Sequence, residues 1–461
     1  MIVKRFFEPL VAQNSYLIGC AAAGEAIVFD PNRDVQQYID VAKAAELRIT
    51  HVTETHIHAD FVSGARELAH RTGARLCLSD EGDANWKYQF DHDRKLKHGD
   101  QITIGNVRVN VLHTPGHTPE HLAFLITDGA VADRPIGAIT GDFIFVGDVG
   151  RPDLLEKAAK IAGTMEIGAK TLWHSLEQFK GYPDWLQIWP GHGAGSSCGK
   201  GISAVPHSTL GYERLFNWAF NAKTEDDFIA NVLAGQPDPP PYFAIMKRVN
   251  KEGPPMLGDR IAPPIVADDR LADMIKGGDL VIDTRPAADF AKGHVPGTLN
   301  IPMNGSFVTW AGWLIPYDRD FYLVVDDGAH GRIAEVQRAL GLIGLDRIAG
   351  YFAASAVAHA GGVETINQIS AGELAHAMPS NGLVVIDVRN DNEWNDGHIP
   401  LAIHIPLGHL EERVAEVPND KTVVLQCQGG GRSSIAASLM QKLGRKNVAN
   451  LTGGYKGWVA G

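Results

Sequence analysis

The sequence predicts an α/β protein whose first half is layered and whose second half contains two copies of one α/β domain. Residues 25–80 alternate strand and helix patterns, which favours a layered α/β arrangement. The segment 281–302 recurs without gaps at 385–406, and such a recurrence indicates a repeated domain. Between about 235 and 265 the chain is rich in Pro and Gly, which marks a connector and a domain boundary.

Apolar runs and helical spacing place the elements of the alternating region in order. Strands are expected at 25–30, 48–55 and 75–79, and helices at 34–47 and 63–74. Further strand-rich stretches read DQITIGNVRVNVLHT, HLAFLITD and RPIGAITGDFIFVGD. In each repeat a strand, a turn and a return strand are expected before a helix. The positions that the two repeats share are Asp283 and Asp387, Arg285 and Arg389, Gly293 and Gly397, His294 and His398, and Pro302 and Pro406.

Length and composition narrow the classes of protein to consider. A chain of 461 residues should hold about three domains, and 44% hydrophobic with 21% charged residues is typical of globular protein. The formal net charge of −12, without a long basic block, argues against nucleic-acid or membrane partners. We see no signal pattern and no apolar stretch of about 18 residues, so a cytoplasmic location is expected. Four scattered cysteines are too few for a disulfide framework.

Polar side chains with metal-binding chemistry follow several of the expected strands. An isolated pair such as His56 and His58 would more often be two loop histidines without a metal. Here further donors each follow an apolar strand, and imidazole and carboxylate are the ligands of transition-metal sites. The candidates are His56, His58, Asp60, His117, Asp142 and His192.

The motifs THIHAD, TPGHTPEH, GDFIFVGDVGRPDL and PGHGAGSSCGKG resemble those of the metallo-β-lactamase superfamily. Within it they are most similar to the persulfide dioxygenases, including the forms fused to rhodanese domains. The resemblance covers residues 1–250 and implies an αββα sandwich that oxidises a low-molecular-weight persulfide.

Phe61 stands where the dinuclear hydrolases of this superfamily have the last histidine of H-x-H-x-D-H, a ligand of the second metal. A phenyl ring has no lone pair to donate, so a full second zinc site is not expected. The resemblance implies one Fe(II) per domain, held by His56, His117 and Asp142. The remaining candidates, His58, Asp60 and His192, would then surround the metal or be remnants of a second site. A dizinc site beside a core-filling Phe61 remains the alternative.

Four other side chains near these motifs are open to two interpretations. Arg151 would bind a substrate carboxylate or phosphate, or else form a structural ion pair. Cys198, in a Gly-rich loop after His192, is either a functional thiol near the substrate or an inert small residue. His113 and His121 match no ligand position and are expected either to be structural or to support the metal ligands from outside.

The segment VVLQCQGGGRSSIAASLMQKLG predicts a reactive thiol. A strand ends at Cys427, a glycine-rich loop runs to Arg432, and a helix follows. Backbone N–H groups of Gly429, Gly430 and Gly431 and the positive helix end would stabilise a thiolate and an anion above it. An inert buried cysteine would not explain the glycines and the arginine.

This loop resembles the rhodanese family, together with VIDVR and GHIP upstream, over residues 363–461. The resemblance implies that Cys427 carries sulfane sulfur, that Arg432 orients an anionic donor or acceptor, and that Asp387 and Arg389 support the fold. The first repeat, 262–360, has Asp326 at the position of the nucleophile and contains no cysteine. It is therefore expected to be an inactive rhodanese-like domain.

Together these expectations describe a bifunctional persulfide dioxygenase and sulfurtransferase that yields sulfite, thiol and then thiosulfate. Its partners would be the persulfide of glutathione or another thiol, O₂ and sulfite, and the resemblance implies a homo-oligomer. A zinc-dependent thioester hydrolase similar to glyoxalase II is one alternative. A non-catalytic persulfide carrier that acts only through Cys427 is another.

Overall fold

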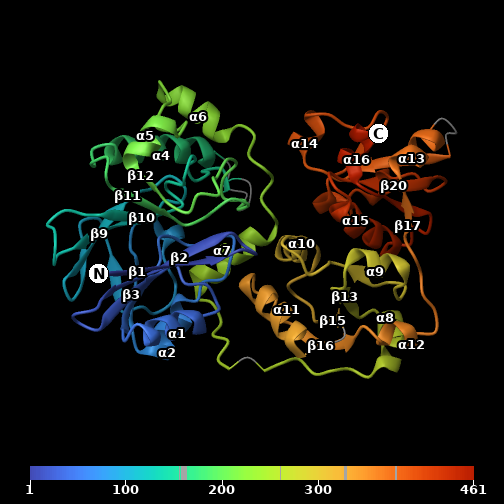
Figure 1. The fold of residues 1–461 in the computed structure, drawn as a ribbon, viewed down its shortest axis with the longest axis horizontal. Helices are drawn as coiled ribbons and strands as arrows, with labels where there is room; N and C mark the ends of the chain where they lie inside the picture. Colours follow the sequence, from blue (N-terminus) through green and yellow to red (C-terminus); the bar gives the residue numbers. More distant parts are fainter. Residues whose placement is uncertain (155, 157–162, 260, 327–329, 379–381) are drawn as a thin grey trace. The chain divides into compact units, whose positions relative to one another are not determined.

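The computed structural model describes residues 1–461 except 155, 157–162, 260, 327–329 and 379–381 (Figure 1). The chain divides into two compact units. The first contains Met1–Arg260 together with Gly341–Gly344, and the second contains the remainder, Ile261–Leu340 and Leu345–Gly461. None of the helices in the described part of the chain combines the length and apolar character that crossing a membrane requires.

The first unit contains two six-stranded sheets. The first sheet has the order β1-β2-β3-β4-β5-β6, with β1 (Ile2–Glu8), β2 (Gln13–Cys20), β3 (Glu25–Phe29), β4 (Arg48–Thr53), β5 (Arg75–Ser79) and β6 (Arg94–Leu96). The second has the order β12-β11-β10-β9-β8-β7, with β7 (Gln101–Ile104), β8 (Val107–His113), β9 (Leu122–Asp128), β10 (Gly137–Gly141), β11 (Gln187–Pro190) and β12 (Ser208–Thr209). The helices are α1 (Gln36–Ala44), α2 (Ala65–Thr72), α4 (Thr164–Phe179), α5 (Leu210–Phe216), α6 (Glu225–Leu233) and α7 (Tyr242–Glu252), with a 3₁₀ turn η1 (Ala84–Trp86).

Alternating side chains of the strands define the layers of this unit. In β2, Leu17 packs in one apolar cluster with Tyr38 of α1 and Leu68 of α2. Its neighbour Ile18 belongs to a second cluster, with Val109 of β8 and other residues of the second sheet. Because successive strand residues point to opposite faces, the first sheet has helices on one face and the second sheet on the other.

The outer face of the second sheet is covered in turn, since a third apolar cluster joins β9 and β10 to α4 and α6. The unit is therefore an αββα sandwich, and this fold prediction is confirmed. The strands and helices expected between residues 25 and 80 are also present, with ends shifted by no more than three residues.

The second unit contains two parallel sheets, one in each repeat. The first repeat has the order β14-β13-β15-β16. Its elements are η2 (Asp268–Arg270), α8 (Leu271–Lys276), β13 (Leu280–Asp283), α9 (Ala287–Lys292), β14 (Leu299–Asn300), α10 (Phe307–Leu314), β15 (Phe321–Val325), α11 (His330–Leu342), β16 (Ile348–Ala353) and α12 (Ala356–His359).

The second repeat has the order β17-β21-β20-β18-β19. Its elements are β17 (Asn367–Ile369), α13 (Ala371–Ala377), β18 (Leu383–Asp387), α14 (Asp391–Asn395), β19 (Ile403–His404), η4 (Leu407–His409), η5 (Val414–Glu416), β20 (Thr422–Gln426), α15 (Gly431–Lys442), β21 (Val448–Leu451) and α16 (Gly454–Ala460). The strand order 14-13-15-16 matches 19-18-20-21, so the two repeats share one fold.

In both repeats the prediction of a turn followed by a return strand is wrong. β14 pairs with β13 in parallel, and β19 pairs with β18 in parallel. A parallel neighbour cannot be reached through a tight turn, because the chain must first travel back along the sheet. The short helices α9 and α14 lie in these crossovers.

Candidate metal centre and thiol loop

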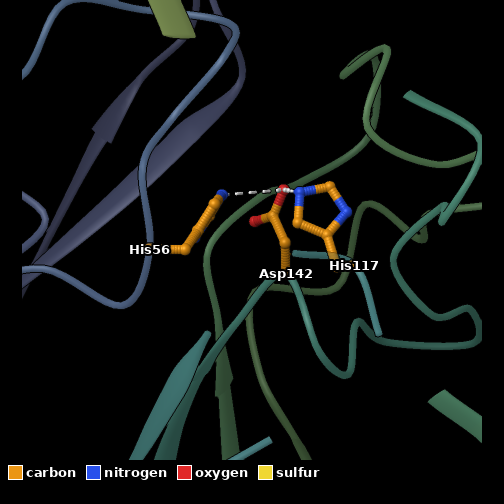
Figure 2. A group of neighbouring side chains, drawn as sticks. All are labelled: His56, His117 and Asp142. Atoms are coloured by element: carbon orange, nitrogen blue, oxygen red, sulfur yellow. Dashed lines mark ion pairs between the residues drawn. The ribbon is translucent and has the colours of Figure 1, made fainter. Parts of the chain in front are cut away.

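Three buried donors from three strand ends meet in the first unit. His56 follows β4, His117 lies between β8 and β9, and Asp142 directly follows β10. The Oδ2 atom of Asp142 lies 3.5 Å from Nε2 of His117 and 3.9 Å from Nε2 of His56. Figure 2 shows both imidazoles turned toward this carboxylate. The structure thus brings together the three residues predicted as ligands, in a group able to hold a metal ion.

Neighbouring groups hold both imidazoles in the orientation that ligands need. Nδ1 of His56 contacts Oγ1 of Thr55 at 2.9 Å, and Nδ1 of His117 lies 3.0 Å from the carbonyl oxygen of Arg151. Each Nε2 is left directed to Asp142, which is how an outer hydrogen bond fixes a metal-binding histidine. Burial, followed by the neighbouring His58 and His117, lowers the pKa of His56 well below its usual range. The neutral imidazole that a metal requires is therefore favoured.

Asp142 shows that these residues fit a metal ion. Its side chain is fully buried, and neither oxygen accepts a hydrogen bond of ordinary geometry from the described residues. A buried carboxylate that accepts no such hydrogen bond is costly, and a cation bound between it and the two imidazoles would remove that cost. His121 steadies the loop, because its Nε2 accepts from the backbone N–H of Asp142 at 3.2 Å.

His58 lies beside this group but interacts elsewhere. Its Nε2 contacts Oδ1 of Asp30 at 3.1 Å, and its ring centroid is 4.4 Å from that of Phe61. Burial alone would lower the pKa of His58, but the carboxylates of Asp30, Glu54 and Asp60 together outweigh it and raise that pKa to about 9. Asp30 also accepts from the backbone N–H of Thr55, so it orders the loop that carries His56. Sequence reasoning missed this carboxylate, whose only signal was its place at the end of an apolar strand.

A second group of donors contains Asp60, His192 and Cys198, all of them buried. Nε2 of His192 lies 3.3 Å from Oδ2 of Asp60, while its Nδ1 contacts the carbonyl oxygen of Ala12 at 3.1 Å. Burial raises the pKa of the Cys198 thiol well above its usual range, and the carboxylates of Asp60 and Asp142 act in the same direction. The sequence placed Cys198 near the substrate but did not join it to these two residues.

Arg151 is fully buried, and its guanidinium is occupied within the chain. Nε and Nη2 donate to the two carboxylate oxygens of Asp153, each at 2.7 Å. Nη1 donates to the carbonyl oxygen of Ser197 and Nη2 also to that of Pro237. Since four of the five N–H donors of a guanidinium are engaged, the geometry favours the structural ion pair over substrate binding. Through Ser197 this arginine also holds the loop of Cys198.

Two further polar residues near the centre have structural contacts. Oε1 of Glu120 accepts from the backbone N–H of Ile57 at 2.8 Å and so supports the loop of His56. His113 contacts the carbonyl oxygen of Pro119 at 2.8 Å, in keeping with the expected structural part. Glu120 was also missed from the sequence, because nothing in TPEH distinguishes a buried glutamate from an exposed one.

The thiol loop of the second repeat closes around Cys427. The backbone N–H of Gly430 points to Sγ at 3.1 Å, and Oγ of Ser433 lies 3.4 Å from the same sulfur. Gly430 has φ of 97°, which lets the loop turn its N–H inward before α15 begins. These donors and the helix N-terminus would stabilise negative charge on the sulfur.

Two arginines flank this loop. Arg432 makes a bidentate ion pair with Glu393, with both N–O distances at 2.6 Å. Arg389 donates to the carboxylate of Asp387 and, through Nη1, to Oε1 of Gln428 in the loop. Arg389 therefore links the buried end of β18 to the thiol loop.

The first repeat differs at the corresponding strand end. Val324 pairs with Asp283, and Gln426 pairs with Asp387, so Val325 rather than Asp326 occupies the position of Cys427. The expected alignment was one residue off at this point. Residues 327–329 of this loop lie outside the described residues. Neither valine nor aspartate can carry sulfur as a persulfide.

A sandwich with buried imidazole and carboxylate donors at its strand ends, followed by two parallel-sheet repeats, defines a metal-binding α/β protein with appended rhodanese-type modules. The Metallo-beta-lactamase superfamily model matches residues 9–192, and the Rhodanese-like domain model matches 267–366 and 370–461. The chain belongs to the metallo-beta-lactamase superfamily and carries two rhodanese-like domains.

Individual relatives agree with this assignment. The crystal structure of a metallo-beta-lactamase from Staphylococcus aureus subsp. aureus COL is 45% identical, with a TM-score of 0.71, and the match covers 76% of this chain and 99% of that one. The mitochondrial persulfide dioxygenase of Homo sapiens is 28% identical over 199 residues, which are 42% of this chain and 68% of that protein.

Hydrolases match the same region. The hydroxyacylglutathione hydrolase of Rhodospirillum rubrum is 28% identical over 177 residues, which are 38% of this chain. The chain spans 60% of the length of that hydrolase, and also 60% of a probable metallo-hydrolase from Burkholderia pseudomallei. The relatives thus include both dioxygenases and hydrolases.

Proposed function

We propose that the first unit is an iron-dependent persulfide dioxygenase and that the second repeat transfers sulfane sulfur to the sulfite produced. The observation that carries the proposal is the convergence of His56, His117 and Asp142, in a chain whose hydrolase motif has Phe61 in place of its last histidine. Fe(II) held on one face by two histidines and one carboxylate supplies redox chemistry with O₂ and keeps positions open for substrate. The human persulfide dioxygenase among the relatives supports this choice.

The overall oxidation balances as one persulfide, one O₂ and one water giving one thiol and one sulfite, with release of two protons. The terminal sulfur of the persulfide is oxidised, and O₂ is reduced. The chain contributes orientation: Thr55 and the Arg151 carbonyl hold the imidazoles, and Glu120 and Asp30 hold the loop around them. The substrate would be the persulfide of glutathione or another small thiol.

The transfer would use Cys427 as the nucleophile. Its thiolate attacks the sulfane sulfur of a persulfide, the S–S bond of that donor breaks, and the donor leaves as a thiolate. Sulfite then attacks the sulfane sulfur on Cys427, which releases thiosulfate and restores the thiolate. The N–H of Gly430 and the hydroxyl of Ser433 stabilise the sulfur anion, and Arg432, which interacts with Cys427 and Glu393, would orient the sulfite.

The second candidate is a zinc-dependent thioester hydrolase, in which the metal would activate water. The similar identity of the hydroxyacylglutathione hydrolases favours it as the alternative. Phe61, in the place of a ligand of the hydrolase motif, is the observation against it.

One set of measurements separates the candidates. Full-length protein is analysed for iron and zinc, and is then supplied with glutathione persulfide while O₂ uptake and sulfite are followed. A glutathione thioester is tested in parallel. We expect iron, O₂ uptake and sulfite, with little thioester hydrolysis. Bound zinc with thioester hydrolysis and no O₂ uptake would establish the hydrolase, and no turnover of either substrate would leave a persulfide carrier.

A further inference from the structure

A cavity lies between the two repeats of the second unit, next to the thiol loop. Its volume of about 590 Å³ is in the range of sites for small organic ligands. Residues of α9 in the first repeat line it, together with Gly429, Gly430 and Gly431 of the thiol loop. The N–H of Gly430 points to Sγ of Cys427, so this glycine borders both the cavity and the sulfur.

Contacts between the repeats hold the walls of this cavity in place. The backbone N–H of Ile366 donates to the carbonyl oxygen of Ala291 in α9 at 3.0 Å. The backbone N–H of Asn300 in β14 donates to Oγ of Ser438 in α15 at 3.1 Å. The helix that follows the thiol loop is thus tied to the first repeat, and the cavity is formed before a ligand binds.

Asn450, which lines the cavity, has an unused hydrogen-bond acceptor. The residue is only 5% exposed, and its Oδ1 accepts no hydrogen bond from the described residues. Its Nδ2 donates to Oε1 of Gln368 at 2.9 Å, and Nε2 of Gln368 donates to the carbonyl oxygen of Ile366. Because buried polar atoms are normally paired, Oδ1 of Asn450 is suited to an N–H donor of a ligand.

Lys292 gives the cavity a positive charge and is the one charged side chain among the described residues that line it. Its ammonium group lies 3.0 Å from Oδ1 of Asp289, but both side chains are more than half exposed, and such a surface pair is weak. A lysine ammonium has three N–H donors, so two remain for an anion.

The corresponding helix of the second repeat has the opposite charge. The residues of α9 that line the cavity are Ala287, Ala288, Ala291 and Lys292, and their counterparts in and directly after α14 are Asp391, Asn392, Asn395 and Asp396. Two aspartates would repel an anion at this wall, whereas one lysine attracts it. The first repeat therefore presents a wall of small side chains and one cation to the thiol loop.

We propose that this cavity binds the thiol part of the persulfide donor through Lys292 and Asn450 and brings its sulfane sulfur to Cys427. The ligand class is a small thiol that has an amide N–H for Asn450 and an anionic group for Lys292. Sulfite does not explain Asn450, because the dianion has no proton to donate, and it would fill little of the cavity. The inactive repeat then acts in substrate recognition. This inference rests on the proposed transfer through Cys427.

The test measures binding beside Cys427 without any transfer of sulfur. Full-length protein is alkylated with iodoacetamide, and the rate at Cys427 is followed by mass spectrometry of its peptide. S-methylglutathione, which has amides and carboxylates but no sulfane sulfur, is one probe. S-methyl-coenzyme A, which has amides and phosphates, is the other and distinguishes the source of the anion. We expect at least one probe to slow alkylation, whereas 2-(methylthio)ethanol, without amide or charge, should not.

Matched lysine variants test the charge. Lys292→Gln should weaken the apparent affinity of the protecting probe by about 3-fold, and Lys292→Asp by about 10-fold. Lys276→Gln is the control and should leave the affinity unchanged. Lys276 and Lys292 are 79% and 77% exposed, and each pairs with an aspartate three residues earlier.

Asn450→Leu tests the acceptor and should weaken protection by about 10-fold, because the N–H of the ligand then loses its partner. If this variant does not fold, the exposed Lys292 still decides the outcome. Absence of protection by both probes, or protection that Lys292→Asp or folded Asn450→Leu leaves unchanged, would overturn the proposal. Failure of the proposed function looks different: protection would depend on Lys292, but persulfide and sulfite would give no thiosulfate.

Discussion

The Oδ1 atom of Asp142 lies 3.5 Å from Nε2 of His192, and the other oxygen of the same carboxylate faces His117. The two histidines thus lie near different oxygens of one buried carboxylate. Removing the imidazole of His117 should therefore change the metal content differently from removing that of His192. This difference tests the assignment of ligands.

For the predicted iron site, we expect His117→Ala to lose iron and O₂ consumption together. It removes one of three protein ligands, and O₂ uptake should fall by more than about 100-fold, since loss of an outer partner alone costs about 10–100-fold. His192→Ala should retain most of the iron. Iron analysis and an oxygen electrode measure both quantities. An empty site in His192→Ala together with a filled site in His117→Ala would show that the ligand set is assigned wrongly.

Separate domains for the two reactions lead to a prediction about products. Cys427→Ser should abolish sulfane transfer and leave persulfide oxidation largely intact, because a hydroxyl is a far weaker nucleophile and cannot carry a persulfide. With persulfide as the sole substrate, the wild type should yield mostly thiosulfate and the variant mostly sulfite. Asp326→Asn serves as the control and should change neither product. Undiminished thiosulfate from Cys427→Ser would assign the transfer to another thiol.

Two neighbouring glycines of the thiol loop should respond differently to alanine. Gly430 has φ of 97°, a conformation that costs an alanine about 1–2 kcal/mol, and its N–H points to the sulfur. A Cβ on Gly429 would meet no atom within 4 Å, and its φ lies outside the left-handed region. Gly430→Ala should therefore slow sulfur transfer and alkylation of Cys427 by about 10-fold or more, whereas Gly429→Ala should change little. Equal losses in the two variants would argue against a special part for the Gly430 N–H.

The stability of the first unit should depend on pH through Glu120. Burial raises the pKa of Glu120 from 4.5 to about 7. Between these values the folded chain holds a proton that the unfolded chain has released. The free energy of unfolding therefore falls as pH rises through this window, by about 3 kcal/mol at most, and levels off above it.

Glu120→Gln should remove this dependence, because an amide does not ionise and its oxygen can still accept from the Ile57 N–H. Urea unfolding of both proteins at about pH 5 and pH 8 measures the difference. The variant should gain stability relative to the wild type as pH rises. Curves that stay parallel across the window would mean that Glu120 remains ionised in the folded protein.

Local features of the sequence were enough to predict the thiol loop and the order of the metal donors. The strand before Cys427, the three glycines and the start of the helix are consecutive, so short-range geometry decides how they fold. The αββα sandwich followed from the resemblance of four motifs, and the structure confirms it. The structure brings His56, His117 and Asp142 together. That they bind iron stays a prediction.

Only the tertiary structure decided how distant segments combine. The sequence did not decide whether Arg151 binds substrate or forms a structural ion pair. In the folded chain its guanidinium is occupied by Asp153 and by the carbonyl oxygens of Ser197 and Pro237. Val325 lies at the position of Cys427 because of the register in which β15 pairs with β13. The residues at the end of a single strand do not specify this register. Likewise, Cys198 meets Asp60 because separate loops of one sandwich pack together, and no local pattern records that contact.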